Sequence, residues 1–198
     1  MCAIAGFTFC DESVIAKMTD VQSHRGPDDS GVYTADGISL GHRRLSIIDV
    51  SPNGRNPLFN EDRTLALVFN GEIYNYRELR AELRPRHIFS SLSDAEVILH
   101  LYEDIGVRAF EKLNGIFALA IWDAAKQELI LARDRLGVKP LYYYYDNRVL
   151  YFASEIKAFK AAGLRLELRP DALSYYFVLG YTAQPLTPLK NVWKFPAG

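Results

Sequence analysis

The stretch Ile116-Phe117-Ala118-Leu119-Ala120-Ile121-Trp122 predicts a β-strand with no polar face. A strand that is apolar on both faces is covered on both sides. After a short turn at residues 123–126, residues 128–132 predict another strand, and strands joined by short turns pair antiparallel. An antiparallel sheet buried on both faces packs against a second sheet on one side and against helices on the other. The sequence therefore predicts an α+β fold of four layers, in the order helix, sheet, sheet, helix, with mostly antiparallel sheets.

The remaining elements are predicted from hydrophobic periodicity and turn signals. Further strands are expected at residues 2–9, 32–34, 38–40, 64–69, 141–145 and 149–153, and helices at residues 12–22, 76–83, 97–105, 155–162 and 170–179. From residue 184 onward the chain resembles a loop with several prolines and no closing element. We therefore expect a domain boundary near residue 198.

Short polar motifs predict where these elements begin and end. Asp36-Gly37 and Asp146-Asn147 predict turns between strands, and Asn70-Gly71 predicts a sharp end to the strand before it. Ser93 and Glu96 have the spacing of a capping box at the start of the third helix, and Gly106 closes that helix.

The composition excludes several classes of protein. The 198 residues carry a net charge of −1, which leaves no basic surface of the kind that binds nucleic acid. The sequence opens with no basic-then-apolar leader and contains no apolar run of membrane-spanning length. Cys2 and Cys10 would lie roughly 26 Å apart in an extended strand, beyond the reach of a disulfide. The reduced thiols predict a cytoplasmic protein. Together with the net charge and the lack of a leader or a membrane-spanning run, they predict a soluble protein that binds neither a membrane nor nucleic acid.

Sequence motifs for metal ions and nucleotides are missing. There is no Cys-x-x-Cys or His-x-x-x-His pair for zinc, and no glycine-rich phosphate loop before Lys-Ser or Lys-Thr. The histidines at positions 24, 42, 87 and 100 are scattered. The sequence therefore predicts no metal ion and no cofactor in this domain.

Cys2 can combine two catalytic groups. If Met1 is removed, the thiol and a free α-amine belong to the same residue. A thiol becomes a good nucleophile as the thiolate, and an α-amine with a pKa of roughly 7.7–8 can accept its proton. One residue would then supply both nucleophile and base. The alternatives are an ordinary cysteine at a frayed terminus and a Cys–His pair in which His42 is the base.

Other polar residues have both a structural and a chemical interpretation. Arg44 can be a surface charge or can form a bidentate pair with a carboxylate. Asn70-Gly71 can be a plain turn or can offer two hydrogen-bond donors to an oxyanion. Glu72 can be a solvated loop charge. Asp94 can stabilise the dipole of the helix that follows or can bind a substrate ammonium group.

Several ordered motifs together resemble a known family. They are the Met-Cys start, Arg-Gly-Pro-Asp (25–28), Arg-Leu-Ser-Ile-Ile-Asp (44–49), Asn-Gly-Glu-Ile-Tyr-Asn (70–75), Ser-Asp-Ala-Glu-Val-Ile-Leu (93–99), Arg-Asp-Arg-Leu-Gly-Val-Lys-Pro-Leu-Tyr-Tyr (133–143) and Ala-Ser-Glu-Ile-Lys-Ala (153–158). The chain resembles the class II glutamine amidotransferases, and most closely the glutaminase domain of glutamine-hydrolysing asparagine synthetases. The resemblance implies an N-terminal nucleophile hydrolase fold of stacked αββα layers, in agreement with the four layers predicted above.

The resemblance also implies roles for the candidate residues. Cys2 would be the nucleophile, and Asn70 with the N–H of Gly71 would form the oxyanion hole. The resemblance gives L-glutamine as the substrate, held at its α-carboxylate by Arg44.

The other end of L-glutamine would meet a second group of residues. Glu72 and Asp94 would bind the α-ammonium group. The backbone at Ile47 and Ile48 would close the pocket.

The family suggests how this domain is used. Residues 1–198 would form one glutaminase domain, covalently linked in the full-length protein to a C-terminal synthetase domain that uses ATP and Mg. That domain would use the ammonia to amidate aspartate, and its pyrophosphate loop does not occur in this sequence. A homodimer is compatible with the sequence, which does not determine the oligomeric state.

Three alternatives fit the same residues. The domain can be a glutamine-binding regulatory module without turnover. It can be a hydrolase of the same fold that cleaves another amide. It can also be an amidotransferase whose ammonia acceptor is not aspartate, selected by residues outside this sequence.

Overall fold

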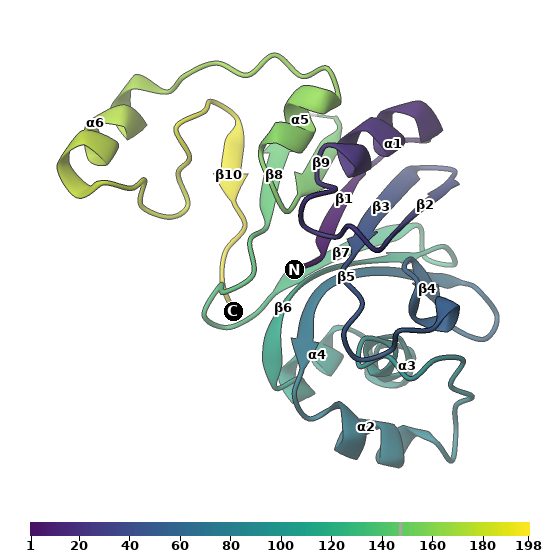
Figure 1. Cartoon of the computed structure of the whole chain (residues 1–198). Helices are drawn as coiled ribbons and strands as arrows, with labels where there is room; N and C mark the ends of the chain where they lie inside the picture. Colours follow the sequence, from purple (N-terminus) through teal and green to yellow (C-terminus); the bar gives the residue numbers. More distant parts are fainter. Residues whose placement is uncertain (147) are drawn as a thin grey trace.

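The computed structural model describes residues 1–146 and 148–198, which form two β-sheets (Figure 1). The turn predicted at Asp146-Asn147 includes residue 147, which lies outside the described residues. The first sheet has the strand order β10 (Val192–Lys194), β8 (Tyr142–Tyr145), β9 (Leu150–Ala153), β1 (Ala3–Phe7), β3 (Ile38–Arg44) and β2 (Asp29–Ala35). The second has the order β4 (Leu58–Phe59), β5 (Leu65–Ile73), β6 (Gly115–Asp123) and β7 (Glu128–Arg133). The strand pairs formed by the described residues are antiparallel, as predicted.

The two sheets stack face to face, with helices on both outer sides. Helices α1 (Glu12–Asp20) and α5 (Lys157–Ala161) pack on the first sheet, and α2 (Tyr76–Leu83), α3 (Glu96–Ile105) and α4 (Ala109–Lys112) cover the second (Figure 1). The short 3-10 helices η1 (Pro52–Gly54) and η2 (Gly106–Arg108) lie in connections. The predicted four layers are confirmed.

Strand β6 has the double burial that its sequence predicts. Leu119 and Ile121 belong to the apolar cluster between the second sheet and its helices. Ala118, Ala120 and Trp122, on the opposite face, belong to the cluster between the two sheets. Alternate residues of one strand therefore serve two different interfaces, because successive side chains point to opposite faces.

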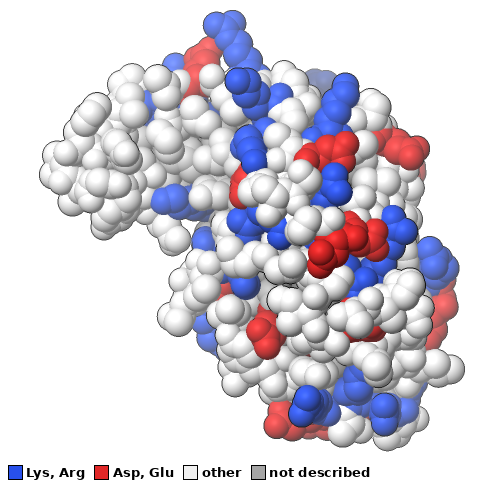
Figure 2. Space-filling view, in the orientation of Figure 1, with Lys and Arg blue, Asp and Glu red and all other residues white. Residues whose placement is uncertain are grey.

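Helix α6 (Pro170–Leu179) extends away from the layers, beyond β10 (Figure 1). Its Phe177 and Val178 are each 82% exposed. The space-filling view shows few charged side chains over this part of the molecule (Figure 2). None of the helices in the described part of the chain is long and apolar enough to cross a membrane.

The structure corrects the prediction that Asn70-Gly71 ends its strand. Strand β5 continues to Ile73, and Asn70 and Gly71 pair with Ala118 and Phe117 of β6. Gly71 is needed there for packing, because a Cβ atom would collide with the backbone of β6. The long ladder with β6 outweighs the local turn preference of the Asn-Gly pair.

Two further expectations are wrong. The C-terminal loop contains the short strand β10, which pairs with β8. The capping box does not form: the Ser93 hydroxyl accepts a hydrogen bond from the N–H of Ala95, and the Glu96 carboxylate accepts hydrogen bonds from the N–H groups of Ser90 and Ser91. Cys2 and Cys10 are both free in the structure.

Candidate active site

The layer between the sheets is apolar at one end and polar at the other. On β3, the inward-facing residues Ile38 and Leu40 belong to the apolar cluster, and a period of two places His42 and Arg44 on the same face. On β5, Ala66 and Val68 are likewise apolar, and Asn70 and Glu72 continue their face. Both sheets therefore turn from core-forming to polar residues at the same edge.

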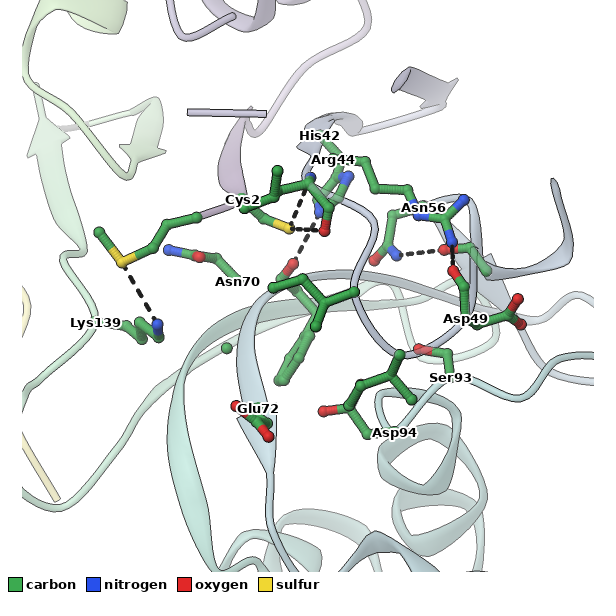
Figure 3. Close-up of a pocket in the computed structure, with 17 residues that line it drawn as sticks. Cys2, His42, Arg44, Asp49, Asn56, Asn70, Glu72, Ser93, Asp94 and Lys139 are labelled. Carbon is green, nitrogen blue, oxygen red and sulfur yellow. Dashed lines mark hydrogen bonds between the residues drawn. The ribbon is translucent and has the colours of Figure 1, made fainter. Parts of the chain in front are cut away.

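A cavity of about 150 Å³ opens at this polar edge (Figure 3). A cavity of this volume can hold a small organic molecule. The structure brings every residue of the predicted site to its wall, namely Cys2, Arg44, Ile47, Ile48, Asn70, Gly71, Glu72 and Asp94.

Cys2 lies immediately before β1, at the wall of the cavity. Its Sγ accepts a hydrogen bond of 3.3 Å from the N–H of Leu45. Burial raises the pKa of the Cys2 thiol, although the Leu45 N–H and the charges of the N-terminus and Arg44 act in the opposite direction. The thiol is therefore largely protonated at neutral pH and requires a base to become a nucleophile.

The backbone around Cys2 is held by a charged pair from two other segments. Arg25 donates from Nε to the Cys2 carbonyl oxygen at 3.0 Å, and its Nη1 donates to the Glu155 carboxylate at 3.2 Å. Met1 precedes Cys2 in the structure, with its sulfur 3.5 Å from the Lys139 ammonium group. The α-nitrogen of Cys2 is therefore a peptide nitrogen here, and it becomes an amine only when Met1 is removed.

His42, the alternative base, contacts a backbone carbonyl group and not the Cys2 thiol. Its Nε2 lies 2.9 Å from the carbonyl oxygen of Phe69. Burial lowers the pKa of His42 to about 4, so the imidazole is neutral and weakly basic at pH 7. Among the described residues, the hydrogen bonds of the Cys2 sulfur are to the backbone of Leu45. The structure therefore shows no Cys–His hydrogen bond in this part of the chain.

Asn70 points a free donor into the polar edge. Asn70 is 1% exposed, and its Nδ2 has no hydrogen-bond partner among the residues that the structure describes. A buried amide group without a partner costs free energy. A ligand oxygen would supply the missing acceptor.

Gly71 adds a backbone donor on the side of β5 that faces away from β6. Peptide groups two residues apart in a strand point the same way. The Phe69 carbonyl oxygen binds His42, and the Ile73 N–H donates to Asp94 at 2.8 Å, both away from β6. The N–H of Gly71 lies between these two, so it points in the same direction, toward the cavity that Gly71 lines.

Arg44 fixes the loop that closes the cavity. Its guanidinium donates to the carbonyl oxygens of Asp49 and Ser51. The Asp49 carboxylate accepts from the Leu92 N–H at 2.8 Å. Burial raises the pKa of Asp49, but the hydrogen bonds from Ser51 and Leu92 outweigh this effect, and the pKa is lowered. Asp49 therefore stays charged and joins the loop to the segment before α3.

Glu72 and Asp94 form an acidic wall opposite Arg44 (Figure 3). The Asp94 carboxylate accepts from the Ile73 N–H at 2.8 Å. Burial raises the pKa of Asp94, and the charge of Glu72 raises it further. A cation bound beside both carboxylates would relieve this repulsion. The cavity therefore offers a positive group at one end and negative groups at the other, which suits an amino acid.

The structure adds wall residues that the sequence did not single out. Leu45 supplies the backbone contact to Cys2, and Asp49 supports the loop. Asn56 has a buried Oδ1 without a partner in the described chain, and Ser93 and Lys139 also line the cavity. Leu45 and Asp49 belong to the quoted motif at residues 44–49, Ser93 opens the motif at 93–99, and Lys139 lies in the motif at 133–143. Asn56 lies in none of the quoted motifs.

Comparisons with known proteins agree with this geometry. A family model described as "Glutamine amidotransferase domain" matches residues 1–198. Glutamine-hydrolysing asparagine synthetase 1 of Bacillus subtilis is 43% identical over 188 residues, covering 94% of this chain and 30% of that protein. Glutamine-hydrolysing asparagine synthetase B of Escherichia coli is 47% identical over 143 residues, covering 72% of this chain and 26% of that protein. Amidase chry2 of Gibberella zeae is 43% identical over 150 residues, covering 75% of this chain and 22% of that protein.

The chain thus spans less than a third of the length of these relatives. Among solved structures, glutamine phosphoribosylpyrophosphate amidotransferase of Bacillus subtilis, complexed with ADP and GMP, superposes with a TM-score of 0.68 at 23% identity. The match covers 82% of this chain and 44% of that one. This likeness confirms the predicted stacked-sheet fold.

Proposed function

Because the chain belongs to the glutamine amidotransferase domain family, we propose that it hydrolyses the side-chain amide of L-glutamine to glutamate and ammonia. One observation carries the proposal most directly. The unpartnered Asn70 amide and the Gly71 N–H line the same cavity as the Cys2 thiol. A thiol beside two convergent donors suits nucleophilic attack on an amide, whose carbonyl oxygen becomes negatively charged in the transition state.

The charged ends of the cavity give the substrate its orientation. Arg44 binds the α-carboxylate of glutamine, and Asp94 with Glu72 binds the α-ammonium group. The backbone at Ile47 and Ile48 closes the pocket. The side-chain amide then reaches Cys2, so only a substrate with an amino-acid end and an amide at this distance is held correctly.

In the proposed reaction, the α-amine of Cys2 takes the proton of the thiol, and the thiolate attacks the amide carbon. Asn70 and Gly71 stabilise the oxyanion of the tetrahedral intermediate. The protonated amine returns the proton to the leaving nitrogen, which departs as ammonia and leaves a thioester on Cys2. Water hydrolyses the thioester, which releases glutamate and restores the thiol.

This mechanism requires an unblocked α-amine, and therefore the removal of Met1. Intact-protein mass spectrometry of active enzyme should show a mass lower by one methionine residue. Full activity of protein that retains Met1 would refute the α-amine as the base.

The activity itself is tested by measuring ammonia and glutamate released from L-glutamine. We expect stoichiometric products from the wild type and none from Cys2→Ala. A protein that binds glutamine without releasing ammonia would instead be the regulatory module. Activity on another amide that Arg44→Ala leaves unchanged would show a different substrate.

We propose aspartate as the final acceptor of the ammonia, in a covalently linked C-terminal synthetase domain that uses ATP and Mg. The names of the two bacterial relatives support this acceptor. The name of chry2 does not mention asparagine, so a non-aspartate acceptor is the alternative. Assaying the full-length protein with glutamine, ATP, Mg and aspartate distinguishes the two.

We also propose a cytoplasmic location. The two free cysteines support it, because reducing compartments preserve thiols. A homodimer stays a prediction, which sedimentation analysis would test.

A further inference from the structure

Four side chains with metal-binding atoms converge on the helical side of the second sheet, outside the cavity described above. They are Glu61, His87, His100 and Glu103, and one ligand atom from each lies within 4.8 Å of all the others. Glu61 belongs to the connection between β4 and β5, and His87 to the connection between α2 and α3. His100 and Glu103 lie on α3, three residues apart and thus on one helix face.

Four nitrogen–oxygen distances in this cluster lie close to those between the ligands of a tetrahedral metal site. Zinc sites place nitrogen and oxygen ligands about 2.0–2.2 Å from the ion, so adjacent ligand atoms are about 3.3–3.6 Å apart. His87 Nδ1 lies 3.5 Å from a Glu61 oxygen and 3.7 Å from Glu103 Oε2. His100 Nδ1 lies 3.4 Å from the other Glu61 oxygen and 3.0 Å from Glu103 Oε2. Small adjustments of these side chains would give four-coordination.

The outer nitrogen of His87 is hydrogen-bonded to a carboxylate, with Nε2 3.0 Å from Asp104. Metal-bound histidines usually donate their second N–H to such a group, which fixes the tautomer and orients the ring. His100 Nε2 lies 3.8 Å from Glu96, beyond hydrogen-bond distance, and has no partner among the described residues. The Nδ1 atoms of both histidines face the glutamates of the cluster.

The two glutamates are held in place as well. Glu103 Oε1 accepts from the Asn60 amide at 2.8 Å, which leaves Oε2 facing the histidines. Glu61 Oε1 accepts from the N–H of Ile88 at 2.9 Å. Each carboxylate thus has one oxygen anchored by a neighbour.

The charges around the cluster favour a cation. Within residues 1–146 and 148–198, the ion pairs of Glu61 and Glu103 are with His87 and His100. Two nearby arginines are engaged with other carboxylates, Arg86 with Asp104 and Arg80 with Glu96. His100 is 1% exposed, whereas Glu61 and Glu103 lie at the surface, so an ion could reach the cluster from the side of the two carboxylates.

We propose that Glu61, His87, His100 and Glu103 bind one divalent transition-metal ion, for which Zn²⁺ is the best fit. Four protein ligands leave no open position, which is typical of a structural site. The ion would fasten α3 to the two connections before it. One of these connections leads to Leu92 and Asp94, so the ion would steady the acidic wall from behind. The sequence contains no His-x-x-x-His pair for this site, because the ligands come from three separate segments.

The proposal is tested on tag-free protein stripped with a chelator and titrated with ZnCl₂ or CoCl₂. We expect one ion per chain, the visible absorption of tetrahedral Co²⁺, and a rise in Tm of about 5–10 °C at a hundredfold excess over the dissociation constant. Asp104→Asn should weaken Zn²⁺ binding about 10–100-fold. His87→Gln and Glu103→Gln, which remove ligands, should weaken it more.

His24→Gln is the matched control. His24 also pairs with a carboxylate, that of Glu155 at 3.0 Å, but on the other sheet's side of the molecule, so Zn²⁺ affinity should not change. Folded wild type that binds neither metal, with Tm unaffected by them, would overturn the proposal and leave the four side chains as a polar network without an ion. Equal binding by His87→Gln and wild type would overturn it too, because the ion would then lie elsewhere. Neither readout needs turnover, so the result is independent of the proposed glutaminase activity.

Discussion

Replacing Asn70 with alanine separates the chemistry of this site from its stability. Asn70 is buried, yet its Nδ2 has no acceptor among the described residues. If the Asn70 amide donates a hydrogen bond only to the oxyanion of the substrate, Asn70→Ala removes a bond that forms only during the reaction. The turnover number should then fall while glutamine binding and folding are nearly preserved.

The sizes of the two effects follow from the contacts. Losing one oxyanion donor should lower kcat about 10²–10³-fold, with KM nearly unchanged. The free energy of unfolding should stay within about 1 kcal/mol of wild type, because the Asn70 side chain makes no hydrogen bond within residues 1–146 and 148–198 and an unsatisfied buried donor is removed.

Asn60→Ala is the matched control for this substitution. Asn60 is also buried, but its Nδ2 donates to Asp62, Thr64 and Glu103, and its Oδ1 accepts from Leu65. Losing these bonds should cost about 3 kcal/mol, and thus lower Tm by about 6–12 °C. The folded protein should keep its kcat, because Asn60 lies outside the cavity wall.

The assay is steady-state ammonia release, with Tm measured by calorimetry on the same samples. Two results would refute the reasoning. A loss of kcat smaller than about threefold in Asn70→Ala would mean that the amide does not stabilise the transition state. A Tm loss in Asn70→Ala as large as that in Asn60→Ala would mean that the amide has a structural role.

Three further predictions address the base, the acidic wall and the buried histidine. A Gly-Ser extension placed directly before Cys2 should abolish ammonia release without lowering Tm, because it acylates the α-amine; activity assays on the purified extended protein test this. Asp94→Asn should raise KM for glutamine about tenfold, the loss of one charge-assisted bond. Because burial raises the pKa of Asp94 above its unfolded value of 3.8, the protonated form contributes stability below that value that is lost as pH rises through the folded pKa. Asp94→Asn should therefore be more stable than wild type at pH 7 and not at pH 3, as measured by urea unfolding. Burial lowers the pKa of His42 from 6.5 to about 4. The neutral imidazole therefore contributes to the stability of the fold above pH 6.5, and this contribution is lost as the pH falls to about 4. The free energy of unfolding of the wild type should fall by about 3 kcal/mol over this range, and that of His42→Gln by much less. The variant should keep its turnover. Loss of turnover with an intact fold would instead make His42 part of the catalytic machinery.

The sequence was most informative where one strand had to satisfy two interfaces. Residues 116–122 are apolar on both faces and are followed by a short turn, and together these features predict an antiparallel sheet with a second sheet on one side and helices on the other. The prediction for Asn70-Gly71 was wrong because the local preference for a turn says nothing about the nine-residue ladder of β5 with β6. Strand β10 is three residues long, and its partner β8 lies far away along the chain, so no local pattern marks it.

In the candidate site too, some features could be predicted from the sequence and others could not. The types of residue needed for amide hydrolysis and their order could be predicted, and the structure brings them to one cavity. Other features depend on how separate segments pack. These are the hydrogen bonds from Arg44 to the loop carbonyls and the convergence of Glu61, His87, His100 and Glu103. Information of that kind is absent from the spacing of residues in a single sequence.

The change from apolar to polar along the inner faces of β3 and β5 has a consequence for evolution. One half of each strand secures the scaffold, and the other half faces whatever molecule is bound. Three residues of the polar half also support the fold, because Arg44 holds the loop, Gly71 packs against β6 and His42 binds the Phe69 carbonyl oxygen. A library for altered amide selectivity should therefore leave these three unchanged and vary the other residues of the cavity wall.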